Sequence, residues 1–133
     1  MNELFWSEEI YGTGDPLVDQ QHQELFKRVN MLSQTLEVEE DAEEVIYFME
    51  FLEGYVRKHF KCEEEIMERK KCSACKLNKN EHAEFLKLYA GFKERFSIEG
   101  PSQQFGEALA VNIRNWIRAH LAATDTKLRE TGP

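Results

Sequence analysis

The sequence lacks the features that mark several classes of protein. It has no apolar run of the roughly 20 residues needed to cross a bilayer, so we expect no membrane span. It has no basic stripe that could follow phosphates, and its 25 acidic against 17 basic residues give a formal charge of −8, which argues against nucleic acid as a partner. It also has no internal repeat and no low-complexity tract. We therefore expect a single domain over residues 1–133, large enough to bury one core.

Cysteine is scarce too. Three cysteines, an odd number, argue against a disulfide-stapled extracellular module and for a reducing compartment, and we expect a cytoplasmic protein. Cys72 and Cys75 form a Cys-x-x-Cys pair in a predicted loop, which fits plain loop cysteines, a thiol switch or part of a zinc site. Cys62 is expected to be a buried thiol beside Glu63.

Apolar residues recur at intervals of three and four after an irregular N-terminal arm of residues 1–16. The pattern predicts amphipathic helices over about residues 17–37, 42–70, 77–97 and 103–121. The breaks fall at an acidic link from Glu39 to Asp41, at Cys72 to Cys75, and at residues 99–102, where Ser102 is a candidate N-cap. Links this short join antiparallel neighbours, so we expect an all-α, up-down-up-down four-helix bundle.

Histidine occurs only four times, and each copy lies in the inward stripe of one helix. The four are His22, His59, His82 and His120. His59 and Glu63 lie four residues apart, an angular offset of about 40° on a helix, so both project from one face and can hold a common ion. Asn78 and His82 share that spacing.

The last pair, His120 and Asp125, does not fit a regular helix. Five residues correspond to a rotation of roughly 140°. For both side chains to reach one site, the helix must end, tighten or carry a π-bulge near Ala122 and Ala123.

Topology predicts that these polar positions form one layer. His22 and His82 lie near the starts of their helices, and His59 and His120 near the ends, so an alternating bundle brings all four to the same end. A lone histidine on an apolar stripe is usually a satisfied core residue. Burying four imidazoles and two carboxylates together without a cation, however, would cost roughly several kcal/mol for each group. We expect two metal ions, because six ligands are too many for one ordinary site and two carboxylates can bridge a pair.

The residues around these positions resemble those of the bacterial hemerythrins over nearly the whole chain. The similar motifs are Phe5-Trp6, Asp19-Gln20-Gln21-His22 with Leu25, His59-Phe60-Lys61-Cys62-Glu63-Glu64 with Met67, Glu81-His82 with Phe85, and Trp116-Ile117 before His120 and Asp125. The resemblance implies a four-helix bundle with two non-heme iron ions, oxo- or hydroxo-bridged when oxidised, that binds O2 or small anions. Phe85 and Trp116 are then expected to line an apolar pocket beside the irons.

The resemblance also implies a ligand set. It assigns His22 and His59 to one iron, His82 and His120 to the other, and Glu63 and Asp125 as bridges. The family normally has a further histidine four residues before His82, where this sequence has Asn78, whose neutral amide is a weak ligand or none. We expect the second iron to be under-coordinated or completed by solvent, and to oxidise more readily.

Four histidines and only two carboxylates differ from the ligand set of carboxylate-rich di-iron enzymes, and favour O2 binding or redox sensing over substrate oxidation. We expect no catalytic residue and no enzymatic activity of this domain by itself. Our main hypothesis is a sensory input domain, the N-terminal part of a longer signalling protein such as a diguanylate cyclase or chemotaxis receptor. A fused output domain of that kind could be catalytic. The alternative is a stand-alone oxygen carrier or store of the bacteriohemerythrin type. A ferroxidase or peroxide-handling enzyme comes third.

Overall fold

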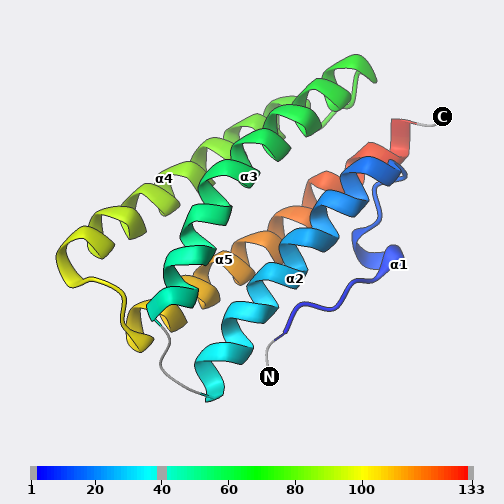
Figure 1. The fold of residues 1–133 in the computed structure, drawn as a ribbon. Helices are drawn as coiled ribbons and strands as arrows, with labels where there is room; N and C mark the ends of the chain where they lie inside the picture. Colours follow the sequence, from blue (N-terminus) through cyan, green and yellow to red (C-terminus); the bar gives the residue numbers. More distant parts are fainter. Residues whose placement is uncertain (1–2, 39–41, 132–133) are drawn as a thin grey trace.

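The computed structural model describes residues 3–38 and 42–131 and is helical (Figure 1). Its elements are α1 (Glu8–Tyr11), α2 (Pro16–Val38), α3 (Ala42–Arg69), α4 (Cys75–Glu99), α5 (Gln103–Ala123) and the 3-10 helix η1 (Asp125–Thr131). No strand occurs among the described residues, and none of their helices is long and apolar enough to span a membrane. The four long helices agree with the predicted ranges to within two residues at each end. The predicted acidic link from Glu39 to Asp41 lies outside the described residues.

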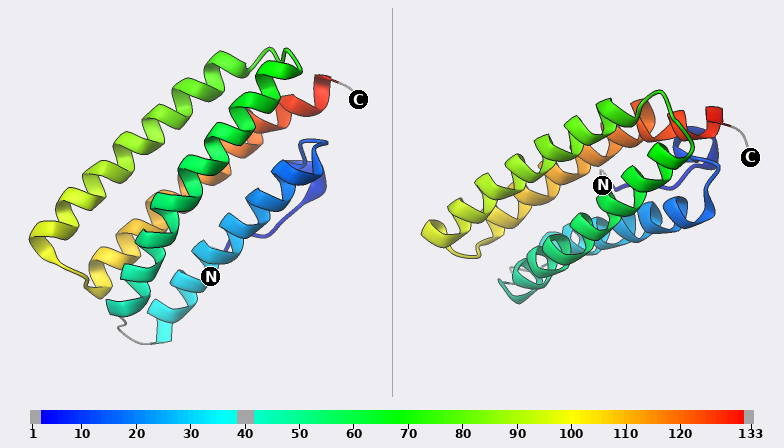
Figure 2. Two further views of the ribbon diagram at one scale, coloured as in Figure 1. Left: turned by 45° about the horizontal axis from the view of Figure 1, so that its top comes forward. Right: turned by 90° about the horizontal axis from the view of Figure 1, so that it is seen from above.

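The four long helices form the predicted antiparallel bundle (Figure 2). Helix α2 packs against α3 and α5, and α4 packs against the same two helices from the other side. Each helix therefore has its neighbours in the chain beside it, and α5 closes the bundle against α2. This topology brings the starts of α2 and α4 to the same end as the ends of α3 and α5 (Figure 1).

Local sequence explains where α5 begins and how closely it packs. The predicted cap is confirmed, because the Ser102 hydroxyl accepts a hydrogen bond from the backbone N–H of Phe105 at 3.1 Å. One turn on, Gly106 lets α5 approach α2 and α3. A Cβ atom there would lie 2.7 Å from Leu36 Cδ1 and 2.9 Å from Val45 Cγ2. A larger residue at this crossing would therefore force α5 or these side chains to shift.

The N-terminal arm is less irregular than the sequence predicts, because it contains the short helix α1. It is fastened to the start of α2 by the buried Asp19, whose Oδ1 accepts hydrogen bonds from the Thr13 N–H at 2.9 Å and the Thr13 hydroxyl at 2.7 Å. At the other side, Arg129 in η1 donates to the backbone carbonyl of Glu9 at 3.1 Å. The arm therefore connects the start of α2 to the C-terminal segment.

Two apolar clusters fill the bundle, and a polar layer separates them. The large cluster occupies the body of the bundle and includes Leu25, Phe60, Phe85 and Ile117. The small cluster closes one end and consists of Val18, Ile66, Met67, Cys72, Ala74 and Leu128. On α2, for example, His22 follows Val18 of the small cluster and precedes Leu25 of the large one. The predicted metal ligands lie in the layer between.

All three cysteines are free thiols that gather at the small apolar cluster. Cys72 is buried within it, and Cys62 and Cys75 are half-buried against it. Cys75 is the first residue of α4 rather than a loop residue. Cys62 is less buried than expected, because its neighbour Glu63 occupies the inward face of α3 and successive helical residues differ by about 100°.

Candidate metal centre

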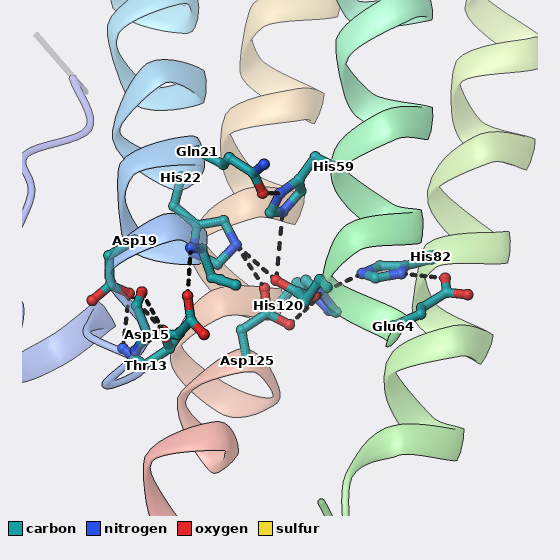
Figure 3. Close-up of polar contacts among 12 residues, drawn as sticks. Thr13, Asp15, Asp19, Gln21, His22, His59, Glu64, His82, His120 and Asp125 are labelled. Carbon is teal, nitrogen blue, oxygen red and sulfur yellow. Dashed lines mark hydrogen bonds and ion pairs between the residues drawn. The ribbon is translucent and has the colours of Figure 1, made fainter. Parts of the chain in front are cut away.

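The structure brings together the six side chains that the sequence singles out, and Figure 3 labels all of them except Glu63. They form two groups that share both carboxylates, and within each group the potential ligand atoms lie within 4.8 Å of one another. The groups are His22, His59, Glu63 and Asp125, and Glu63, His82, His120 and Asp125. All six residues are buried. Each long helix supplies one histidine, so the predicted single layer is present.

Glu63 lies between the two histidine pairs. Its Oε2 is 2.9 Å from Nε2 of His22 and 3.4 Å from Nε2 of His59. Its Oε1 is 3.1 Å from Nε2 of His82 and 4.0 Å from Nε2 of His120. Each carboxylate oxygen therefore faces one pair, which is the arrangement of a bridging ligand.

Asp125, the first residue of η1, repeats this arrangement. Its Oδ2 is 3.1 Å from His22 Nε2, and its Oδ1 is 2.8 Å from His120 Nε2. The helix break that the spacing required is present: α5 ends at Ala123, Thr124 departs from regular helix geometry with φ −114° and ψ −56°, and the tighter η1 begins at Asp125. Ending and tightening of the helix, not a π-bulge, turn Asp125 back toward His120.

Three of the four imidazoles are fixed through their other ring nitrogen, each by a side chain of the preceding long helix. The contacts, each 2.7 Å long, join His59 Nδ1 to Gln21 Oε1, His82 Nδ1 to Glu64 Oε2, and His120 Nδ1 to Glu81 Oε1. Amide and carboxylate oxygens accept hydrogen bonds here, so the Nδ1 atoms donate. The Nε2 atoms are thereby left facing the carboxylates of Glu63 and Asp125.

The charges of the site fit a bound cation. Burial lowers the pKa of His22 and His120, but the short contacts with Asp125 and Glu63 and the negative charge of both carboxylates outweigh it and raise the two values to about 9 and about 10. Burial raises the pKa of Glu63, but the surrounding imidazoles hold it well below 4.5. For His59, burial dominates and lowers the pKa. The two carboxylates thus draw positive charge into the layer, and metal ions supply such charge in place of protons.

Unpaired polar atoms also fit a metal pair. Both Asp125 oxygens and His120 Nε2 lack a hydrogen bond of acceptable geometry, although Oδ1 lies 2.8 Å from His120 Nε2 and Oδ2 lies 3.1 Å from His22 Nε2. Four imidazole nitrogens with carboxylate oxygens form a donor set suited to first-row transition metals. The residues present therefore fit two adjoining cations.

Asn78 is fully buried one turn before His82 on α4, and its amide nitrogen and oxygen both lack a hydrogen-bond partner. A buried amide without partners is uncommon in proteins and calls for an explanation such as an ion or water. Its spacing from His82 places it on the same side of α4.

Aromatic rings cover the half of the layer formed by His82 and His120. Phe60 stacks on the His82 ring with 3.7 Å between centroids and an angle of 5°. Trp116 stacks on the His120 ring at 4.4 Å and 20°, and Phe85 contacts Trp116. These rings form an apolar wall beside the imidazoles, where the sequence placed Phe85 and Trp116.

Sequence reasoning did not assign a role to the residues that hold the imidazoles. Gln21, Glu64 and Glu81 each directly adjoin a predicted ligand in the sequence, which is the only signal that could have pointed to them. Their partners lie on the following helix, so the pairing depends on how the helices are rotated against each other.

The fold and the site together define a class: helical-bundle proteins with a buried histidine and carboxylate cluster suited to two metal ions. Comparison with protein families gives the same result, since the family described as "Hemerythrin HHE cation binding domain" matches residues 13–130. The chain belongs to the hemerythrin family.

Relatives of known name match the chain over most of its length. A bacteriohemerythrin of Stenotrophomonas maltophilia (strain R551-3) is 27% identical over 92% of this chain and 76% of its own length. One from Methylococcus capsulatus (strain Bath) is 26% identical over 92% and 91%. Among solved structures, wild-type hemerythrin superposes with a TM-score of 0.77 at 26% identity, covering 92% of both chains. A leucine-to-alanine mutant of hemerythrin gives 0.81 at 25% identity, over 96% and 95%.

Proposed function

We propose that this domain binds O2 reversibly at a pair of iron ions and acts as an oxygen carrier or store. The observation that carries the proposal is that Glu63 and Asp125 each turn one oxygen toward each half of the site. The bacteriohemerythrins matched over most of the chain support the carrier hypothesis better than the signalling input favoured from the sequence.

In this proposal His22 and His59 hold one ion and His82 and His120 the other. The iron pair, when bound, supplies the electrons for reversible O2 binding. Glu63 and Asp125 balance the charge of both ions, and the Nδ1 contacts hold the rings with Nε2 directed inward. The rings of Phe60 and Trp116, stacked on His82 and His120, exclude water on one side of the site. This protects a bound ligand from solvent.

The test starts from metal-free protein reconstituted with Fe(II) in the absence of air. We expect two irons per chain, uptake of O2 on exposure to oxygen, and recovery of the O2 when the gas phase is replaced by argon. Absorption spectra recorded through several cycles measure reversibility. Binding of one iron or none would contradict the proposal at the level of the site, and irreversible oxidation in the first cycle would contradict the carrier role.

Asn78 supports redox sensing as a second candidate function. A neutral amide where the family normally has a histidine leaves the ion held by His82 and His120 with one strong donor fewer. Stopped-flow mixing of the diferrous protein with O2 separates the two functions. If the domain is a redox sensor, its iron pair is expected to be oxidised at once. The substitution Asn78→His is then expected to slow that oxidation. Long-lived O2 binding by the native protein, unchanged by Asn78→His, favours the carrier.

A further inference from the structure

The side chains that hold the imidazoles differ between the two halves of the site. In one half, both histidines donate to carboxylates: His82 to Glu64 and His120 to Glu81. In the other half, His59 donates to the neutral amide of Gln21. His22 is fully buried, and its Nδ1 has no hydrogen-bond partner. Two negative charges thus support one half and none supports the other.

Glu81 makes a second contact, with the residue that ends α5. The same Oε1 that accepts from His120 Nδ1 also accepts from the Thr124 hydroxyl at 2.5 Å. Thr124 is buried and is the residue at which α5 breaks, directly before Asp125. One carboxylate therefore orients a histidine and fixes the chain at the residue preceding a shared carboxylate.

A carboxylate that accepts the Nδ1 proton makes an imidazole a stronger donor at Nε2, and it offsets part of the charge of the ion. Solvent screens the charges of Glu64 and Glu81 only in part, because their side chains are 28% and 29% exposed. A neutral amide orients the ring but adds no charge.

We propose that Glu64 and Glu81 are positioning residues that make the half of the site formed by His82 and His120 the stronger of two unequal cation sites. The inference rests on the ligand assignment of the proposed function but not on O2 binding. It follows that cations fill this half first, although Asn78 offers it only a neutral donor.

Titration of the metal-free protein with Co²⁺ tests the inequality, because Co²⁺ is stable to air in such sites and its absorption reports binding. We expect two resolved steps. Glu64→Gln and Glu81→Gln each keep an accepting oxygen and remove the charge, and each should weaken the tighter step by about 10- to 100-fold. The weaker step should change by less than about threefold, within the range of indirect effects.

The matched controls are Glu65→Gln on α3 and Glu84→Gln on α4. Each removes one negative charge from an exposed position on the same helix as Glu64 or Glu81. Neither should change either step appreciably. Gln21→Glu adds the missing charge behind His59, and should tighten the weaker step while leaving the tighter one unchanged. Comparing Glu81→Gln with Glu81→Ala separates charge from geometry, because alanine also releases the Thr124 hydroxyl.

Two outcomes overturn the inference while leaving the proposed function intact. One is a native titration in which both ions bind with the same affinity. The other is a pair of resolved steps that Glu64→Gln and Glu81→Gln weaken equally. A protein that binds no second Co²⁺ at all overturns the proposed ligand assignment, and the inference with it.

Discussion

At the scale of single residues, the buried polar side chains of the layer differ in how many neighbours depend on them. Glu63 faces all four imidazoles, whereas Asn78 has no partner for either amide atom. We predict that Glu63→Ala and Asp125→Ala each lose most of the bound iron, because each removes a charged oxygen from both halves. Asn78→Ala should keep nearly all of it, since a neutral amide contributes at most one weak bond. Iron per chain after desalting measures the difference, and equal losses would identify Asn78 as a full ligand.

The imidazoles also predict how the metal-free protein responds to pH. The pKa values of His22 and His120, about 9 and about 10, exceed the usual 6.5. Their contribution to stability is therefore complete below pH 6.5 and is lost as the pH rises through 9 to 10. His59, whose pKa burial lowers, acts in the opposite direction, with its contribution lost as the pH falls below 6.5.

We accordingly predict that the melting temperature of the protein in chelator falls between pH 7 and pH 10. Metal-loaded protein should not show this fall, because metal ions replace the protons. Differential scanning calorimetry at intervals of one pH unit measures both curves. His120→Gln lacks one of the two titrating groups and serves as the control with a shallower fall. A melting temperature that rises over this range in chelator contradicts the prediction.

At the scale of helices, the sequence predicted what depends on periodicity and missed what depends on rotation. Spacing of apolar residues gave the four long helices, and the interval from His120 to Asp125 required the break that the structure has at Thr124. The contact of Glu81 with His120 could not be predicted, because it joins α4 to α5 and depends on how these helices face each other. Helix α1 was missed because four residues are too few to show a period.

The close approach of α5 to α2 and α3 at Gly106 gives a prediction about stability. Gly106→Ala would place a Cβ atom 2.7 Å from Leu36 Cδ1 and 2.9 Å from Val45 Cγ2, so α5 or these side chains must shift. We expect a loss of about 1–3 kcal/mol in the free energy of unfolding, the usual cost of overpacking. Gly54→Ala in α3 is the control. Its Cβ meets nothing within 4 Å, and it should gain up to about 1 kcal/mol from helix propensity. Urea unfolding of both variants measures the contrast, and equal effects would contradict the close crossing.

At the scale of the whole molecule, the layer joins all four long helices through one cluster. Ions bound there must be released when the bundle unfolds, so binding and folding are linked. At a free Co²⁺ concentration 100 times the dissociation constant, we predict a gain of about 2.7 kcal/mol for each site filled. Urea unfolding with and without metal measures this gain, and chelator should reverse it. Full occupancy with no change in the unfolding midpoint would contradict the linkage.

Because Asp125 lies on η1, we expect ions bound in the layer to leave without unfolding of the bundle. This carboxylate is on η1, outside the four long helices, and Leu128 of the same segment helps to close the small apolar cluster over the layer. When η1 separates from the bundle, a shared carboxylate and part of the cover leave together, while every histidine stays on its helix. We therefore expect the residence time of the ions to follow the opening rate of the seven residues of η1 and not the unfolding rate of the domain.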